Sequence, residues 1–443
     1  MKKTLIGLAA VVAASVTIVA CGGGYGSSSS NGQNVSGLKF RAFVSNPLFS
    51  GGGGSNPVLN IMDASKDVLS GSTVSLAGSQ GGLMVVSPNL RFSLVVSPTG
   101  TITVIDNTTE AAAHNGTATV SPINLPGATE SIVIAKDSTT VYAALPAAEV
   151  LGQPPGAVVK ISLSSGSVQA SIPVPAARFL ALSPDGNNLL VFSDNSNSVT
   201  LIDTVLIGTN NNPIQLIAGF DRPVWAIFAN NTTAYVFNCG AECPGGVAAG
   251  LTTLDVGTLS PGPIVPLSGA TYALLNGGLL YVAGTPPHTA CPPGTAASTC
   301  GTLSIVDVNA MRVTNPSPIL ITDGYHNRME MGANGQLFVG ARSCTSINNP
   351  GGEVRGCLSI FNSNTAKVVI PPQVGDATGI APIPGRTVVY VCQGGVFQMF
   401  DTTTDKLLVQ VNLINGVPTN IVGDSIDVKV VDPPPAKCIQ NCT

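Results

Sequence analysis

A residue that ends a short apolar strand, usually aspartate, recurs along the chain and limits the possible folds more than any other feature. Each copy of the repeat has an apolar strand, a polar or glycine turn, a second apolar strand, a loop, and a third strand ending in this marker. The eight markers are Asp63, Asp106, Ser162, Asp203, Asp255, Asp307, Asn362 and Asp401, spaced 39 to 56 residues apart. A repeat of about 50 residues with about four short strands predicts the blades of an all-β propeller.

The two ends of the repeat region predict how such a ring closes. The first unit has three candidate strands, Phe40–Val44, Val58–Met62 and Thr73–Leu76, and lacks an innermost one. The segment Ser425–Val431 is a strand with no unit after it. Pairing this strand into the first unit leaves no sheet edge open. We therefore predict a single β-propeller of four-stranded blades over residues 38–432, closed by its N- and C-terminal strands.

The composition agrees with blades that bury both faces of each sheet. Charged residues make up 9% of the chain, against about 25% in an average protein. Hydrophobic residues make up 44%, and the 50 glycines and 33 prolines lie largely between β-rich runs. The net charge of −4 with only 19 Lys and Arg argues against nucleic acid as a partner.

The second strands of several units carry a further pattern. They read Thr140-Val141-Tyr142, Ala234–Asn238, Leu280–Val282 and Val389–Val391, and Ser183-Pro184-Asp185-Gly186 forms a turn before another. The pattern resembles the YVTN-type β-propeller family, which is related in fold to lactonase-like propellers, over nearly all of residues 38–432. The resemblance implies the fold and leaves the activity open. That family often closes with seven blades, so seven is the alternative to the eight that the markers indicate.

The N-terminus resembles a bacterial lipoprotein signal. Lys2 and Lys3 precede the apolar run Leu5–Ala20, and Cys21 follows. The resemblance implies cleavage after a signal peptide at residues 1–20 and lipidation of Cys21. Residues 21–37 then form a Gly/Ser-rich tether. The alternatives are an ordinary secretory signal or a short membrane anchor. Gly22 after the lipidated cysteine favours an outer-membrane lipoprotein, periplasmic or surface-facing.

The other nine cysteines fit an oxidising compartment. Their spacing predicts the disulfides Cys239–Cys243, Cys291–Cys300, Cys344–Cys357 and Cys438–Cys442, the last in a Pro/Cys tail at residues 433–443. Cys392 is left over in an apolar run and is expected to be a buried free thiol. Metal binding by the two CxxxC pairs is an alternative, but neither pair has a histidine within ten residues. We predict no metal and no cofactor.

Familiar catalytic motifs are absent from the sequence, including GxSxG, HExxH, CxxCH and GxxxxGK[ST]. Of the three histidines, His114 and His288 are expected to be solvated loop residues. The remaining candidates lie in the links between one blade's outer strand and the next blade's inner strand, which open around the central channel. These links hold many of the scarce charges. The predicted funnel consists of Glu130, Arg178, Asp221, Arg222, Trp225, Asp323, His326, Arg328, Glu330, Asp376 and Asp424.

Such a funnel suits a small anionic or polar ligand, although its charges could equally hydrate the channel or pair across blades. Trp225 could line the funnel or pack between blades. If the funnel is catalytic, His326 or Asp323 is the candidate general base, and Arg328 would hold an oxyanion or carboxylate.

Four insertions between second and third strands form another candidate surface. They are residues 146–156, 239–250, 284–300 and 342–356, and three of them contain cysteines. Loops pinned by disulfides could present a surface to an envelope protein or glycan, or the disulfides could only protect the loops from proteolysis.

Together these features favour a lipid-anchored binding or interaction scaffold in the bacterial cell envelope. The alternative is a lactonase-like hydrolase of a small sugar lactone that uses the funnel. Whether the protein is an enzyme is left open, with a scaffold favoured.

Overall fold

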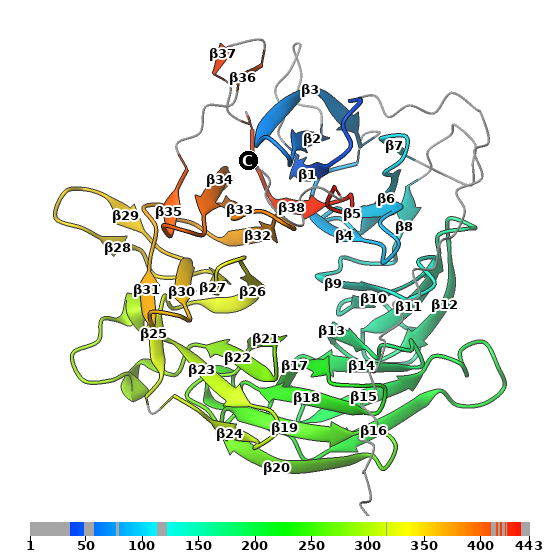
Figure 1. Cartoon of the computed structure of the whole chain (residues 1–443). Coiled ribbons are helices and arrows are strands. Elements are labelled where there is room, and N and C mark those ends of the chain that lie inside the picture. The colour runs from blue at the N-terminus through cyan, green and yellow to red at the C-terminus, as the bar shows by residue number, and fades with distance from the viewer. Residues whose placement is uncertain are drawn as a thin grey trace, which may run out of the picture. The chain divides into compact units, whose positions relative to one another are not determined.

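The computed structural model is built almost entirely of β-strands, arranged as eight sheets around a central axis (Figure 1). The structure describes residues 36–47, 57–76, 79–112, 122–315, 317–408, 413–414, 417–418, 421 and 423–435. The predicted signal peptide, Cys21, most of the tether, His114 and the Cys438–Cys442 pair lie outside the described residues. Eight of the sheets form the blades of a propeller; in blades 2 and 6 the fourth, outermost strand is made of two short pieces, so the propeller and its eight four-stranded blades are confirmed.

The blades follow one another in chain order. Blade 1 contains β1 (Arg41–Asn46), β2 (Val58–Asp63), β3 (Val68–Ser75) and β38 (Asp427–Val430). Blade 2 contains β4 (Leu83–Val86), β5 (Phe92–Val96), β6 (Thr101–Asp106), β7 (Ala111–Ala112) and β8 (Ile123–Asn124), which also pairs with β6. Blade 3 contains β9 (Ser131–Ile134), β10 (Thr140–Leu145), β11 (Ala157–Ser162) and β12 (Ser167–Pro173). Blade 4 contains β13 (Ala177–Leu182), β14 (Asn188–Ser193), β15 (Ser198–Asp203) and β16 (Ile214–Ala218).

The other half of the ring has the same plan. Blade 5 contains β17 (Pro223–Phe228), β18 (Thr233–Asn238), β19 (Gly250–Asp255) and β20 (Ser260–Pro266). Blade 6 contains β21 (Tyr272–Asn276), β22 (Leu279–Gly284), β23 (Gly301–Asp307), β24 (Arg312–Val313) and β25 (Ile319–Ile321). Blade 7 contains β26 (Tyr325–Met331), β27 (Gln336–Arg342), β30 (Leu358–Asn362) and β31 (Lys367–Val369). Blade 8 contains β32 (Ala377–Pro382), β33 (Val388–Gln393), β34 (Val396–Asp401) and β35 (Lys406–Leu407). The hairpins β28 (Ile347–Asn348)–β29 (Val354–Arg355) and β36 (Leu413–Ile414)–β37 (Val417–Pro418) lie outside the blades.

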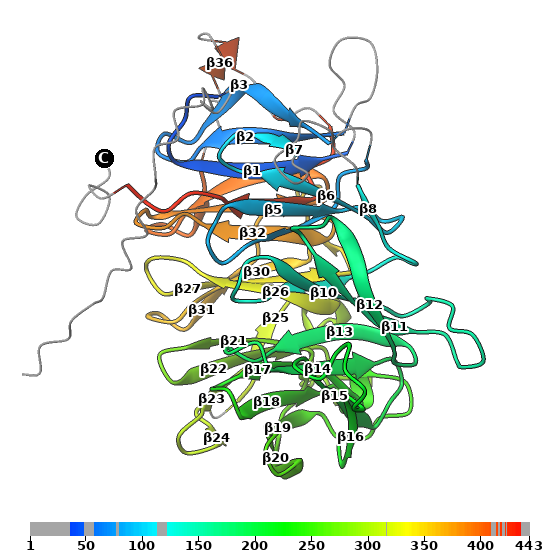
Figure 2. The ribbon, with the colours of Figure 1, turned by 90° about the vertical axis from the view of Figure 1, so that its right-hand side faces the viewer.

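The hydrophobic core lies between blades. Eight clusters of buried side chains each join two neighbouring blades. One of them packs Phe43 and Ile61 of blade 1 against Val95 and Ile105 of blade 2, and Figure 2 shows these blades side by side. Because each sheet is covered on both faces, its middle strands are mostly apolar and buried, as in β10, where five of the six residues are buried. This packing explains the low content of charged residues.

The recurring marker is the last residue of the third strand in every blade, counted outward from the channel. In seven blades its side-chain oxygen accepts a backbone N–H two residues further on; Asp63 accepts the Ser65 N–H at 3.0 Å and Asn362 the Asn364 N–H at 3.0 Å. In blade 3, Ser162 accepts the Ser165 N–H at 3.3 Å. The marker therefore fixes the turn into the fourth strand through a side-chain cap of the kind that Asp and Asn favour.

The ring closes as predicted. β38 pairs antiparallel with β1, with Ala42 opposite Val430 and Val44 opposite Val428. The C-terminal strand thus supplies the innermost strand of blade 1. The third candidate strand of the first unit begins earlier than predicted, at Val68, because the turn at Asp63 is only four residues long. No helix in the described part of the chain is long and apolar enough to cross a membrane.

Candidate functional site

The innermost strands of the blades surround a channel that contains three neighbouring cavities. The mouth cavity has a volume of about 290 Å³, the middle cavity about 320 Å³ and the far cavity about 470 Å³. Phe179 and Tyr325 line both the mouth and the middle cavity, and Trp225 and Tyr272 line both the middle and the far cavity. The cavities therefore follow one another along the channel.

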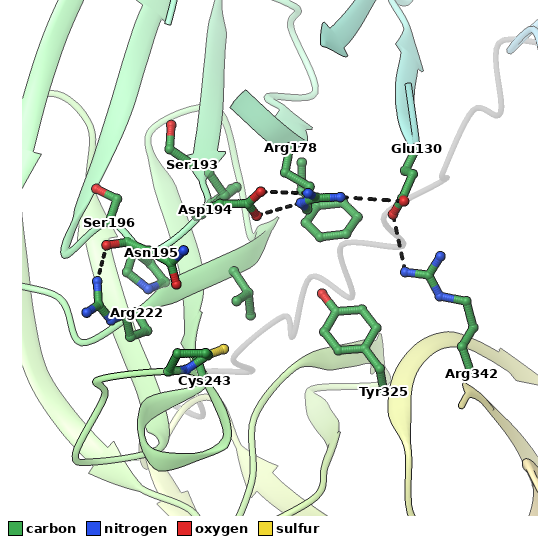
Figure 3. A pocket seen from close by; sticks show the side chains of 15 residues that line it. Glu130, Arg178, Ser193, Asp194, Asn195, Ser196, Arg222, Cys243, Tyr325 and Arg342 are labelled. Carbon is green, nitrogen blue, oxygen red and sulfur yellow. Dashed lines mark hydrogen bonds and ion pairs between the residues drawn. The ribbon is translucent and has the colours of Figure 1, made fainter. Parts of the chain in front are cut away.

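Charged side chains gather at the mouth cavity (Figure 3). Arg178 forms a bidentate ion pair with Asp194, in which its Nε and Nη2 lie 2.5 and 2.6 Å from the two carboxylate oxygens. Its Nη1 lies 3.5 Å from Glu130. Glu130 also contacts Arg342, at 3.2 Å. The hydrogen bonds that Arg178 donates to Asp194 raise the pKa of Arg178, so this guanidinium is a permanent charge.

A β-bulge directs Arg178 into the channel. The register between β13 and β14 shifts between Ala177 and Phe179, which leaves Arg178 without a partner in the ladder. β17, β26 and β32 have the same shift at the same place, so Val224, Asn327 and Thr378 are the equivalent bulged residues. Bulges re-aim side chains and bend the strand, and three of the four bulged residues, Arg178, Val224 and Asn327, line the channel cavities.

Arg222 is the third arginine of the mouth, and it differs from the other two. It lies directly before β17 in the left-handed region, with φ of 54°. Its Nη1 donates to the carbonyl of Asn195, while its Nε is buried with no hydrogen-bond partner among the described residues. No carboxylate of the described chain forms an ion pair with it.

The disulfide loop of blade 5 supports Arg222. The Cys239 N–H donates to the Arg222 carbonyl at 3.0 Å, and Cys243 and Pro244 line the mouth cavity. A Cβ on Gly245 would lie 2.7 Å from the Arg222 guanidinium. Arg342 begins the insertion of blade 7, so two of the four insertions contribute to the mouth. The predicted funnel and the predicted loop surface therefore meet at one site.

Aromatic rings line the channel below the arginines. Phe179 and Tyr325 are stacked at 6.4 Å, and the Arg342 guanidinium lies 5.4 Å from the Tyr325 ring centre. Further in, Trp225 and Tyr272 stack at 4.2 Å with an angle of 10° between the rings. Trp225 also stacks on Phe237 at 6.0 Å. Trp225 of blade 5 therefore lines the channel and also stacks on Tyr272 of the neighbouring blade 6.

A second charged group lies deeper, in the middle cavity, and contains Arg328, Glu330 and Lys429. Arg328 donates to the carbonyls of Thr378 at 3.0 Å and Asn327 at 2.8 Å. Burial raises the pKa of Glu330, and the nearby Lys429 and Arg328 partly oppose that shift. Charges are therefore present along the channel and not only at its mouth.

His326 lines the same cavity but is only 1% exposed. Its Nε2 lies 3.0 Å from the Thr322 carbonyl, and its buried Nδ1 has no hydrogen-bond partner among the described residues. Burial lowers the pKa of His326 to about 4. The ring is therefore neutral at neutral pH, and the general-base role of His326 stays a prediction.

Four of the predicted funnel residues do not line these three cavities, and the carboxylates of the first three of them hold loops: Asp221, Asp323, Asp376 and Asp424. Asp221 accepts the backbone N–H groups of Val247 and Ala248, at 2.9 and 2.6 Å. Asp323 accepts the Thr345 N–H at 2.8 Å.

The other two carboxylates of this set belong to the links that enter blade 8 and β38. Asp376 accepts the Ser343 N–H at 2.8 Å. The backbone N–H of Asp424 donates to Asn46 at 3.1 Å.

Several residues of the mouth and channel were not predicted from the sequence: Asp194, Tyr325, Arg342, Phe179, Tyr272 and Lys429. Asp194 directly follows the second strand of blade 4 and Arg342 ends the second strand of blade 7, so neither belongs to a link between blades. Their part in the site depends on which strand ends share a face of the ring, which the sequence does not show.

Three disulfides are present as predicted, Cys239–Cys243, Cys291–Cys300 and Cys344–Cys357. Cys392 is a buried free thiol, also as predicted, and burial raises its pKa. Both observations agree with a structural, unreactive role for Cys392.

These observations define the chain as an eight-bladed β-propeller with an arginine-rich channel mouth. No protein-family model matches its sequence, and no curated protein matches it. Among solved structures it is similar to dihydro-heme d1 dehydrogenase NirN in complex with DHE, with a TM-score of 0.58, 13% identity, and coverage of 87% of this chain and 74% of that one.

Two further solved structures share the fold. A eukaryotic initiation factor gives a TM-score of 0.50 at 12% identity, covering 89% of this chain and 98% of that one. The β-propeller domain of Myceliophteria thermophila Cps50 (Swd1) gives 0.50 at 11% identity, covering 71% and 93%. At these identities the likeness shows the propeller fold alone.

Proposed function

We propose that this protein is a lipid-anchored, YVTN-type β-propeller of the bacterial cell envelope that binds a small anionic ligand at the channel mouth. The observation that carries the proposal is the arrangement of Arg178, Arg222 and Arg342 around one cavity of about 290 Å³. Glu130 and Asp194 neutralise two of these charges, and Arg222 remains. A positive cavity with one unpaired guanidinium suits a carboxylate, sulfate or phosphate group.

The contacts that hold the arginine side chains of the mouth cavity in place favour ligand binding over catalysis. Arg178 is held by a bulge and two carboxylate contacts, and Arg222 by the Cys239–Cys243 loop. Groups fixed in advance lose little entropy when a ligand binds. The hydrolase alternative needs His326 or Asp323 as its general base. His326 is 1% exposed with its Nε2 engaged by Thr322, and the Asp323 carboxylate accepts the Thr345 N–H at 2.8 Å.

A thermal-shift screen of the full-length protein in detergent tests the binding site. The panel contains sugar acids, lactones, sulfated and phosphorylated sugars, and envelope glycans. A ligand at 100 times its dissociation constant adds about 2.7 kcal/mol, or about 3 °C for a chain of this size. The shift should disappear in Arg222→Gln and persist in the control Arg312→Gln, because Arg312 is exposed on β24. An equal shift in both variants would place the ligand elsewhere.

The anchor and the alternative activity have separate tests. Cys21→Ala should move the protein from the membrane fraction to the soluble fraction and abolish labelling by a radioactive fatty acid; unchanged labelling would contradict the anchor.

For the hydrolase alternative, turnover of the lactone panel should be lost in His326→Ala or Arg328→Ala variants that remain folded. If no member of the panel binds the mouth, the insertions 284–300 and 342–356 become the candidate surface for a protein or glycan partner.

A further inference from the structure

A histidine and a disulfide meet in the insertion of blade 6, away from the residues that line the channel. The insertion joins β22 to β23 and contains two short 3-10 turns, η2 (His288–Ala290) and η3 (Ala297–Thr299). Each turn is followed by one half-cystine, Cys291 after η2 and Cys300 after η3. His288 Nδ1 lies 3.5 Å from the Cys291 Sγ.

Three donor atoms converge at this place. The His288 ring nitrogen and the sulfurs of Cys291 and Cys300 all lie within 4.8 Å of one another. In the described part of the chain this is the one group of three such donors with this spacing. Thiolate and imidazole are the ligands that tetrahedral zinc sites use most.

The spacing also fits the size of such a site. Zinc binds sulfur at about 2.3 Å and nitrogen at about 2.0–2.1 Å, so a tetrahedral site has an N–S edge of about 3.5 Å and an S–S edge of about 3.8 Å. The N–S edge is already present, at 3.5 Å. That edge joins His288 to Cys291, and Cys300 Sγ lies within 4.8 Å of the same ring nitrogen. The two sulfurs must separate, while their Cα atoms lie 5.6 Å apart.

The surroundings hold the donors and leave a path to them. Cys300 is 2% exposed at the base of the loop, next to Gly301 of β23, whereas His288 is exposed. The turns fix the backbone near both cysteines, through Cys291 N–H to the His288 carbonyl at 3.2 Å and Cys300 N–H to the Ala297 carbonyl at 3.1 Å. A cation could therefore enter from the His288 side.

We propose that His288, Cys291 and Cys300 form a redox-gated site for Zn²⁺. Oxidised, the two sulfurs are bonded to each other and only His288 is a good ligand. A dithiol or phosphine reductant supplies two electrons and, with two protons, cleaves the S–S bond to two thiols. The dithiol becomes a disulfide, and the phosphine becomes its oxide with an oxygen atom from water. Zn²⁺ then displaces the two thiol protons and binds both thiolates and the neutral imidazole, with water as the fourth ligand.

The test compares the oxidised full-length protein in detergent with protein reduced by a phosphine and freed from reductant. Bound Zn²⁺ is measured by competition with a colorimetric chelator. Reduction should create a site that Cys291→Ser/Cys300→Ser removes and that His288→Ala weakens at least tenfold. The matched control Cys344→Ser/Cys357→Ser should keep the site, because no histidine joins that pair in the described structure.

Substitution with Co²⁺ gives a readout independent of stoichiometry. The reduced protein should show sulfur-to-cobalt charge transfer and tetrahedral ligand-field bands, both lost in Cys291→Ser/Cys300→Ser. Equal Zn²⁺ binding by oxidised and reduced protein would overturn the proposal. So would a reduced site that is insensitive to His288→Ala, or one that persists in Cys291→Ser/Cys300→Ser, which would assign the metal to thiols elsewhere, such as the CxxxC pairs.

Discussion

Arg41 and Asp432 are 391 positions apart, yet the Arg41 guanidinium contacts both carboxylate oxygens of Asp432 at 2.7 Å. The Arg41 backbone N–H donates to the same carboxylate at 2.8 Å, and Nη1 reaches the buried Glu110 at 2.7 Å. Asp432 follows β38, Arg41 begins β1, and Glu110 lies in blade 2. One ion-pair network therefore connects the first strand, the C-terminal strand and blade 2 where the ring closes.

This network should contribute measurably to stability. Asp432→Asn leaves the 4% exposed Arg41 short of one negative partner, and removing one partner of a buried pair costs about 3 kcal/mol. The midpoint of urea unfolding should fall accordingly. Glu353→Gln is the control, because its pair with Arg355 is partly exposed and exposed ion pairs contribute little to stability. Equal effects of the two substitutions would show that the closing pair has no special role.

The turns after the marker residues should depend on the side-chain oxygen of the marker and not on its charge. Asp307 accepts the N–H groups of Asn309 and Ala310 at 2.8 and 3.1 Å, and Asn362 makes the same pair of contacts in blade 7. Asp307→Asn should therefore be nearly neutral, whereas Asp307→Ala should lower the free energy of unfolding by about 1 kcal/mol. Chemical unfolding of the two variants separates these outcomes; similar losses in both would mean that the charge, and not the cap, matters.

His326 should make the protein less stable in acid. Its pKa falls from 6.5 to about 4 on folding because the ring is buried, so the unfolded chain binds the proton more readily. The stabilisation is present above pH 6.5 and is lost as the pH falls toward 4. In His326→Gln this part of the pH dependence should vanish, even if the variant is less stable throughout. Stability curves of both proteins between pH 4 and 8 check this, and parallel curves would contradict it.

Glu242 should act in the opposite direction. Its Oε2 is buried without a hydrogen-bond partner among the described residues, and burial raises its pKa from 4.5 to about 8. The folded state therefore holds the proton more tightly, and stability declines as the pH rises from 4.5 through 8. Glu242→Gln should be more stable than the parent at pH 9, with no such gain at pH 4. The exposed Glu149→Gln is the control, and a gain of equal size there would argue against a role for burial.

Much of the fold could be read from the sequence because its signals are local. A turn cap such as Asp255 acts on its own next residues, at 2.8 and 3.1 Å, so a residue with a side-chain oxygen recurs at the end of each third strand, Asp in six blades, Ser162 and Asn362 in the other two. The spare strand Ser425–Val431 was recognisable because a closed ring leaves no unpaired strand. The candidate site was predicted less well, because neighbouring residues can play different parts. Asp221 holds a loop through a backbone N–H, whereas Arg222, the next residue, lines the mouth cavity.

The sequence by itself determined the eight units, the strand that closes the ring and the nearest-neighbour disulfides, because each depends on residues within one repeat or on its count. Only the tertiary structure decided which charges meet. Glu130, Arg178 and Arg342 come from three different blades, and bulges at the inner strands set which of their neighbours face the channel. His288 and Cys300 likewise meet only because the loop folds back on itself. Side-chain direction and the distance between blades are properties of the packed ring, and no single repeat encodes them.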